Sequence, residues 1–362
     1  MPGDPSAIRS AARNHTSWMT ARAEAAGGGV REHGSLRWIV SAAGEGASLP
    51  FPASVTGPDA DAMLADCRAR RQSGIGCWTT GLEPIGEVAA VLVARGFEWG
   101  WSAHWMLFDL DALPAIDDDR VRVAPGPVRD SWTARAAGGQ AMVHLIGDEA
   151  GLYDVGVDPG SQRAGLGRSL TVAVLTAARR AGATIATVNA TEDGERLYRA
   201  LGARSLGLGQ TFWIHADGLA APPPAELVAA AEAAGRGEVA APPDVVGVRV
   251  PGNGMGLAHI AHAAGHPATA RELAAAGAPL DALLAYALDG AAGLERVALD
   301  EQIGRMGGTV LHEAVRMRDG GLLRAALAAG ADPDARDRTY DATPLDWARH
   351  LHNPEAEELL RR

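Results

Sequence analysis

The sequence predicts an α/β protein with a mixed sheet and flanking helices, followed by an all-α domain at the C-terminus. Two observations support this fold class. Between residues 132 and 214, short apolar runs alternate with helical patterns in the order β-β-β-α-β-α-β. Beyond residue 250, a short motif recurs between helical patterns, which indicates a repeat. Because 362 residues exceed what one hydrophobic core usually supports, we expect several domains.

Proline and charge clusters mark the expected domain boundaries. Three aspartates and three prolines interrupt regular structure in residues 112–127, and more prolines cluster in residues 216–251. The predicted organisation is a first lobe at 1–115, a second lobe at 120–215, a linker or irregular cap at 216–250, and a repeat domain at 251–362.

The charge is acidic overall and uneven along the chain. The net charge is -11, from 33 basic and 44 acidic side chains, and every basic residue is Arg. Residues 120–215 hold 11 Arg against 8 acidic residues and form the only basic part, so we expect an anionic ligand there. A negative total gives no long-range attraction to nucleic acid, and no nucleic-acid partner is expected.

Cysteine content and hydropathy indicate a cytoplasmic protein. Cys67 and Cys77 allow one disulfide at most and give no basis for a zinc site, so we expect reduced thiols and no metal. No apolar run is long enough to span a membrane, and the N-terminus lacks the pattern of a signal peptide. No membrane partner is expected.

Glycines punctuate the elements of the second lobe. Gly138 and Gly139 predict a hairpin, and Gly182 and Gly202 are expected helix stops. The predicted elements are strands 132–136, 141–146 and 152–157, helix 169–181, strand 184–188, helix 195–201 and strand 211–214.

A glycine-containing loop joins the third strand to its helix. The sequence from Val155 to Arg168 reads VGVDPGSQRAGLGR. Gly165 and Gly167 let backbone amides approach a ligand at the helix N-terminus, where the helix dipole favours phosphate. Arg163 and Arg168 add charged hydrogen bonds. The loop lacks the Gly-Lys-Ser/Thr of a nucleotide P-loop, and no acidic residue ends the next strand as in a dinucleotide fold.

This loop resembles the acetyl-CoA motif of the GNAT superfamily of N-acyltransferases, Gln/Arg-x-x-Gly-x-Gly/Ala. Gln162 and the two glycines match it. The next landmark of the family is a strand ending in Asn, then a helix with Leu-Tyr and Leu-Gly. Asn189 and residues 197–202 match that landmark. The family usually continues with Gly-Phe, whereas Ala203 follows here.

The resemblance implies roles for named residues. Backbone amides of residues 163–168 would hold the pyrophosphate of CoA. The strand 152–157 would splay from its neighbour and pair with the pantetheine arm, with its N–H near Val157 polarising the thioester carbonyl. Tyr198 would protonate the departing thiolate. The implied cofactor-binding set is Val155, Gly156, Val157, Gln162, Arg163, Ala164, Gly165, Leu166, Gly167, Arg168 and Asn189.

Several residues are candidates for the base that accepts the proton of the amine. Glu149 and Asp154 lie next to or in the central strand, and strand alternation places them on opposite faces. Only one of them can then point at the substrate. His144 on the preceding strand is a third candidate, and proton removal through water is the remaining route. The predicted catalytic set is Tyr198, Glu149 and Asp154.

A second copy of the closing elements lies in the first lobe. Residues 84–97 form a helical pattern that ends in Leu92-x-x-x-Gly96-Phe97, and the aromatic run 99–108 predicts a strand. This order resembles the end of a GNAT unit. No Gln-x-x-Gly-x-Gly loop precedes it, so the resemblance implies tandem GNAT-like lobes, of which the first is degenerate and binds no cofactor.

The second lobe is also incomplete. Residues 121–132 leave no room for the two helices that normally follow the first strand of a GNAT unit. We therefore expect the two lobes to share one sheet or cleft. Trp99, Trp101 and Trp105 share a face of the predicted strand 99–108, which makes them core residues or the aromatic wall of a substrate cleft.

The C-terminal part repeats a short motif. Thr309-Val-Leu-His-Glu-Ala recurs from Thr343, 34 residues later, and an earlier copy starts at Gly256. The pattern resembles the ankyrin repeat. The resemblance implies that His259 and His312 cap turns by hydrogen bonding and bind no metal. It also implies a module for a protein partner, a homodimer, or cover of the substrate cleft.

Together, these features predict an acetyl-CoA-dependent N-acetyltransferase, an acyltransferase that transfers groups other than aminoacyl groups. Acetyl-CoA is the co-substrate, and no metal is required. The predicted acceptor is a primary amine of a small cationic molecule, such as an amine-bearing antibiotic in a resistance enzyme, acetylated by direct transfer. The alternatives are a protein acetyltransferase targeted by the ankyrin repeats and a non-catalytic acetyl-CoA-binding interaction protein.

Overall fold

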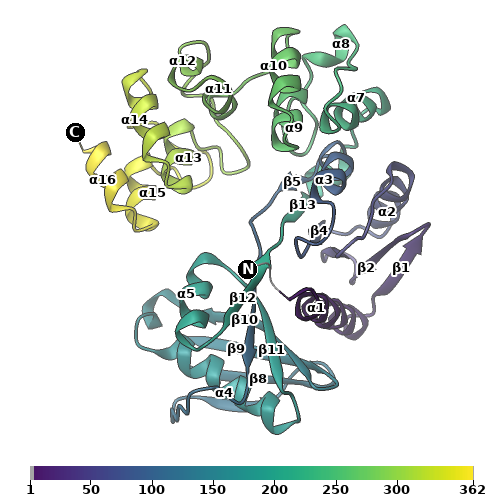
Figure 1. Ribbon diagram of the computed structural model, residues 1–362, viewed down its shortest axis with the longest axis vertical. Coiled ribbons are helices and arrows are strands. Elements are labelled where there is room, and N and C mark those ends of the chain that lie inside the picture. Colours follow the sequence, from purple (N-terminus) through teal and green to yellow (C-terminus); the bar gives the residue numbers. More distant parts are fainter. Residues whose placement is uncertain (1–3, 362) are drawn as a thin grey trace. The chain divides into compact units, whose positions relative to one another are not determined.

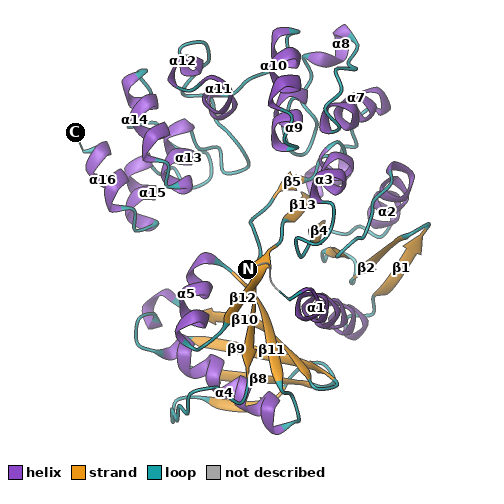
Figure 2. Ribbon diagram, viewed as in Figure 1, coloured by secondary structure: helices purple, strands orange, loops and turns teal. Residues whose placement is uncertain are grey.

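The computed structural model describes residues 4–361, which form two compact units (Figure 1). The first unit comprises Met1–Val88 and Glu98–Ala220, and the second comprises Ala89–Phe97 and Ala221–Arg362. The first unit is α/β with mixed sheets and flanking helices, and the second is helical (Figure 2). The predicted fold class is confirmed at this level. Across residues 4–361, no helix combines the length and apolar character needed to cross a bilayer.

A seven-stranded mixed sheet forms the second lobe. Its central strands are parallel to each other, and its other neighbours pair antiparallel. Helices α4 (Leu166–Arg180) and α5 (Glu192–Ala200) belong to this lobe, and apolar side chains of α4 are buried in its core. In spatial order the strands are β12 (Arg204–Leu208), β6 (His104–Asp109), β11 (Ile185–Ala190), β10 (Glu149–Val157), β9 (Gly139–Ile146), β8 (Ser131–Ala136) and β7 (Arg122–Pro125).

A six-stranded sheet forms the first lobe. Helix α2 (Gly57–Ala69) contacts its first two strands. In spatial order the strands are β1 (Gly29–His33), β2 (Leu36–Val40), β3 (Ala47–Pro50), β4 (Gly74–Trp78), β13 (Thr211–His215) and β5 (Glu98–Trp99).

The two lobes exchange a strand. β6 follows β5 in the chain, yet it inserts between β11 and β12 of the other sheet and pairs antiparallel with both. In return, β13 inserts between β4 and β5. Each sheet therefore contains a strand from the other lobe. Both lobes lie within one compact unit, and the ranges predicted for them stay predictions.

The exchange breaks the predicted aromatic strand 99–108 in two. Trp99 lies in β5 of one sheet, and Trp105 lies in β6 of the other. The prediction of one strand with three tryptophans on one face is wrong, because the chain crosses between sheets here. Trp105 is buried in the core, and Trp101 in the connection is 39% exposed.

Helix α1 (Pro5–Ala25) packs against strands of both sheets (Figure 1). It begins with Asp4, whose carboxylate accepts a hydrogen bond from the Ser6 N–H, followed by proline at the first turn. Asn14 anchors the helix to the second lobe, since its Nδ2 donates to the carbonyls of His144 (3.2 Å) and Glu149 (3.1 Å). The second lobe, which lacks helices after its first strand, is thus covered in part by a helix of the first.

The second unit consists of helices in succession. Polar contacts join residues 93–97 to the rest of this unit. Arg95 forms an ion pair with Glu232, and the Asn253 side chain donates hydrogen bonds to the carbonyls of Val93 and Phe97. Residues 282–306 contain two helices, the second of four residues. The helices are α3 (Ile85–Val93, shared with the first unit), α7 (Ala225–Gly235), α8 (Pro243–Val246), α9 (Leu257–Ala263), α10 (Pro267–Ala275), α11 (Ala282–Asp289), α12 (Ala291–Leu294), α13 (Val310–Met317), α14 (Gly320–Ala328), α15 (Pro344–His350) and α16 (Pro354–Leu360).

The two histidines of the repeats have structural contacts. The buried His312 accepts from the Thr309 N–H at Nδ1 (3.0 Å), and its Nε2 lies 3.0 Å from the Ala342 carbonyl. This confirms its predicted capping role. His259 lies 2.8 Å from the Asp281 carboxylate, so it joins two segments of its repeat. The helix pairs are consistent with the predicted repeats, and their assignment to the ankyrin family stays a prediction.

Candidate functional site

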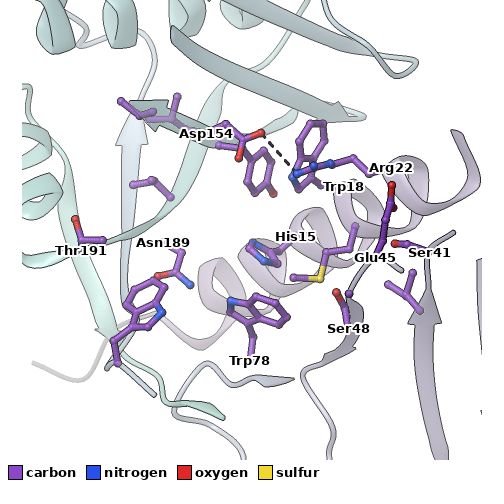
Figure 3. A pocket seen from close by; sticks show the side chains of 18 of the residues that line it. His15, Trp18, Arg22, Ser41, Glu45, Ser48, Trp78, Asp154, Asn189 and Thr191 are labelled. Atoms are coloured by element: carbon purple, nitrogen blue, oxygen red, sulfur yellow. Dashed lines mark ion pairs between the residues drawn. The ribbon is translucent and has the colours of Figure 1, made fainter. Parts of the chain in front are cut away.

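A cavity of about 900 Å³ opens within the first unit (Figure 3). Its walls come from both lobes: α1, β2 and β4 of the first, and β10, β11 and α5 of the second. A volume of this size suits a small organic ligand together with part of a cofactor. Its lining includes His15, Trp18, Arg22, Asp154, Asn189 and Tyr198.

Strands β10 and β11 separate beside this cavity. Their parallel pairing runs from Glu149 opposite Ile185 to Leu152 opposite Val188 and then stops, although both strands continue. A register shift between Tyr153 and Gly156 on the β9 side bends β10 away. The splay expected of the strand 152–157 is therefore present. Backbone groups of β10 on the β11 side lack a sheet partner beyond Leu152, and can pair with an extended ligand.

The glycine-containing loop lies at the end of this opening. Helix α4 begins after Gly165, which has φ 77°, a conformation that favours glycine. A Cβ placed on Gly167 would be 3.5 Å from both Val157 of β10 and Leu197 of α5. The N-terminus of α4 thus lies next to the end of β10 and to α5, the helix that follows β11. Gln162 ties the loop to β10, because its Nε2 donates to the Val157 carbonyl (3.2 Å).

Asn189 and Tyr198 both line the cavity. The Nδ2 and Oδ1 atoms of Asn189 are buried and have no hydrogen-bond partner in the described residues. Leaving such atoms unpaired costs free energy, which makes Asn189 a candidate ligand-binding residue of the cavity wall. Tyr198 is 5% exposed, and burial raises the pKa of its hydroxyl to about 12. The hydroxyl is therefore a proton donor at neutral pH.

The structure separates the three candidate bases. Asp154 lines the cavity, and its carboxylate lies 3.7 Å from the Arg22 guanidinium (Figure 3). Glu149 does not line it and pairs with Arg13 at 3.3 Å. His144 lies outside it too, with its Nε2 3.0 Å from the Ser17 hydroxyl.

The β-bulge changes the strand alternation on which the sequence argument relied. Asp154 has φ 49°, and Tyr153, Asp154 and Val155 all line the cavity. The two-residue alternation is interrupted at these three residues, because the extra residue of a bulge breaks it. Of the other predicted cofactor residues, Gly156, Val157 and residues 162–168 lie outside the cavity lining, along β10 and the α4 loop.

The residues that sequence reasoning missed come from the first lobe. His15, Trp18 and Arg22 extend from α1 into the cavity, and Trp78 extends from β4 (Figure 3). The Trp18 ring stacks on Tyr153 of β10, with centroids 4.9 Å apart, and the Arg22 guanidinium lies over it. The apolar spacing of α1 could have indicated an amphipathic helix, but not its partner sheet.

The corresponding position in the first lobe has no opening. β3 pairs with β4 along its whole length, from Ala47 opposite Ile75 to Pro50 opposite Trp78. The N-terminus of α2 is capped by its own chain, since Thr56 Oγ1 accepts from the Asp59 N–H. The opening between β10 and β11 therefore has no counterpart between β3 and β4.

The cysteines and potential metal ligands add no second site. Cys67 and Cys77 are free and buried, and burial raises the pKa of the Cys67 thiol to about 12. Within the described part of the chain, no group of three or more His, Cys, Asp or Glu side chains could hold a metal ion.

Comparison with solved structures finds GNAT acetyltransferases, one of them a tandem GNAT protein. No family model matches the sequence, and no curated protein matches it. A GCN5-related N-acetyltransferase from Kribbella flavida is 16% identical, with a TM-score of 0.45, over 56% of this chain and 95% of that one. One from Sphaerobacter thermophilus is 12% identical, with a TM-score of 0.36, over 59% and 95%. A tandem GNAT protein from the clavulanic acid biosynthesis pathway is 14% identical, with a TM-score of 0.35, over 50% and 78%. Similarity this low gives no argument about activity, so a proposed function depends on the site.

Proposed function

We propose that this chain is an acetyl-CoA-dependent N-acetyltransferase of the GNAT type that acetylates a primary amine of a small cationic molecule by direct transfer. The observation that supports this most is the opening between β10 and β11, which has the N-terminus of α4 at one end. The same two strands border the cavity that the first lobe helps to form.

The opening suits the three parts of acetyl-CoA. Backbone N–H groups of residues 163–168 and the positive end of the α4 dipole would bind the pyrophosphate, with help from Arg168. The unpaired edge of β10 would hydrogen-bond the amides of the pantetheine arm. The thioester would then reach the cavity, near the buried polar atoms of Asn189.

The proposed reaction transfers the acetyl group in one displacement. The neutral amine attacks the thioester carbonyl carbon, the C–N bond forms, and the C–S bond breaks. Tyr198 gives its proton to the departing sulfur and recovers one from the attacking nitrogen, so the products are an amide and CoA thiol. Tyr198 suits this role because it is buried at the cavity and protonated at neutral pH.

The cavity walls favour a cationic acceptor. Glu45 and Asp154 contribute carboxylates, against the single guanidinium of Arg22, among the lining residues of the described chain. Trp78 and Trp101 add aromatic side chains to the lining, a residue type that attracts cations. An amine-bearing antibiotic is one member of this substrate class.

The test is release of CoA thiol from acetyl-CoA with a panel of acceptors: putrescine, tryptamine, kanamycin and a lysine-containing peptide. We expect acetylation of at least one small amine, with the acetyl-amide identified by mass spectrometry, and no acetylation of the peptide. Turnover of the peptide alone would favour a protein acetyltransferase. Binding of acetyl-CoA with no acceptor turned over would contradict the proposed enzyme.

A further inference from the structure

A serine, a histidine and a glutamate form a chain of hydrogen bonds in the seven-stranded sheet and α5. Ser205 lies in β12, His104 in β6 and Glu195 in α5. The Ser205 Oγ lies 2.7 Å from Nε2 of His104, and Nδ1 of His104 lies 2.7 Å from the Glu195 carboxylate. None of the three lines the cavity, and the proposed acetyl transfer uses none of them.

The strand register brings these side chains to one side of the sheet. Ser205 is the cross-strand partner of Met106, and His104 precedes Met106 by two residues, so all three side chains leave the sheet on the same side. Helix α5 lies on this side too, since the Tyr198 ring packs edge-on against Phe108, two residues after Met106. Glu195 of α5 can therefore reach His104 from above the sheet.

The carboxylate fixes the tautomer of His104. Arg199, whose Nε lies 2.6 Å from the Glu195 carboxylate, and His104 hold the pKa of that carboxyl below its usual range, so it is ionised at neutral pH. An ionised carboxylate only accepts hydrogen bonds, and Nδ1 of His104 must donate to it. In the neutral ring Nε2 is then unprotonated and accepts the Ser205 hydroxyl. The serine proton thus points at the nitrogen that can take it.

A second serine–histidine contact in the chain lacks this carboxylate. Ser17 lies 3.0 Å from Nε2 of His144, but the buried Nδ1 of His144 has no hydrogen-bond partner among the described residues. Ser17 is also part-buried, whereas Ser205 is exposed in β12, which lies at an edge of its sheet as the structure describes it. A molecule in solution can therefore approach Ser205.

We infer that Ser205, His104 and Glu195 form an esterase site for small carboxylic esters, separate from the cavity. Ser205 is the nucleophile, His104 is the base, and Glu195 positions His104 in the required tautomer. Such a site acts on short esters that need no deep pocket, because Ser205 is on the surface.

The reaction balances with water as the second reactant. The Ser205 oxygen attacks the ester carbonyl carbon, and its proton passes to Nε2 of His104. The C–O bond to the leaving alcohol breaks, and the imidazolium gives the alcohol this proton. Water then attacks the acyl-serine by the same route, releases the carboxylic acid and restores the serine. In sum, one ester and one water become one acid and one alcohol.

Covalent labelling tests the nucleophile. In a fluorophosphonate probe, an activated serine oxygen bonds to phosphorus, fluoride leaves, and the serine proton goes to the histidine. We expect about one probe per wild-type chain, located on Ser205 by peptide mass spectrometry. Ser205→Ala should take up no probe, and His104→Gln and Glu195→Gln should react at least about 10-fold more slowly. Ser17→Ala is the matched control and should react as the wild type does.

Hydrolysis of p-nitrophenyl acetate tests turnover. We expect the wild type to release nitrophenol about 100-fold faster than Ser205→Ala. The melting temperatures of all variants are measured alongside, because a purely structural link between α5 and the sheet would change them and leave the reactivity of Ser205 unaltered.

Three results would overturn the inference: no adduct on Ser205, an adduct that forms as fast in both His104→Gln and Glu195→Gln as in the wild type, or ester hydrolysis as fast in Ser205→Ala as in the wild type. Neither assay contains acetyl-CoA. Their outcome is therefore independent of the proposed acetyl transfer.

Discussion

Replacing Arg168 by Glu should weaken acetyl-CoA binding about 100-fold without unfolding the protein. Arg168 lies in the first turn of α4, beside the N–H groups that would bind the pyrophosphate. The substitution removes a charged hydrogen-bond donor and puts a carboxylate against the phosphates. A glutamate in the first turn of a helix interacts favourably with the helix dipole, so the melting temperature should not fall.

Arg180→Glu is the matched control for this experiment. It makes the same change of charge in the same helix, at the opposite end. Isothermal titration calorimetry with acetyl-CoA should show wild-type affinity for Arg180→Glu and weak binding for Arg168→Glu. Equal affinities for the two variants would show that the α4 loop is not the phosphate site.

Tyr198→Phe should lower kcat about 100-fold and leave acetyl-CoA affinity unchanged. The variant keeps the ring that packs edge-on against Phe108 and removes only the hydroxyl proton donor. Because the thiolate would then leave without protonation, the loss should appear in kcat and not in binding. Steady-state kinetics with thiol detection, alongside calorimetric affinity, separates the two effects. An unchanged kcat would remove Tyr198 from the mechanism.

Tyr153→Phe should lower the stability of the protein, in contrast to Tyr198→Phe. The Tyr153 hydroxyl donates to Asn14 at 2.7 Å and so joins β10 to α1. Its loss leaves a buried amide oxygen short of a donor, and should lower the free energy of unfolding by about 1 kcal/mol. Tyr198→Phe should leave the free energy of unfolding nearly unchanged. Urea denaturation of both variants measures this difference.

Local patterns predicted most of the second lobe. The helix expected at 169–181 is α4, Leu166–Arg180, and the strand expected at 141–146 is β9, Gly139–Ile146. The spacing of apolar residues and the glycines that end helices are local features, each spanning only a few residues. Both can therefore be recognised from the sequence alone. Strand β7 was not predicted, because all four of its residues are exposed and give no apolar pattern. Strand β12 was not predicted, because its pairing with β6 is irregular at Gly207.

The exchange of β6 and β13 could not be predicted from these patterns. A buried apolar strand can form backbone hydrogen bonds with the edge of any sheet, and its own residues do not specify which strand it pairs with. The predicted strand 99–108 joined two segments that belong to different sheets. We expected the lobes to share one sheet or cleft. The structure has two sheets, each of which contains a strand of the other lobe, and a cavity that both lobes line.

The side of the cavity formed by α1 was missed for a similar reason. Asn14, His15 and Arg22 contact or face residues of the second lobe that are more than a hundred positions later in the sequence. A motif search of either lobe alone cannot detect such a set. The residues of the proposed cofactor side, from β10 to the start of α4, are consecutive, and a sequence motif can therefore mark them.

Binding of acetyl-CoA in the opening between β10 and β11 can be measured by hydrogen exchange of the full chain, with and without acetyl-CoA. We predict slower exchange at the backbone amides of residues 153–157 and 163–168, with no change along β3 or at the start of α2 in the first lobe. Protection confined to β3 and α2, or no protection in either lobe, would contradict the account.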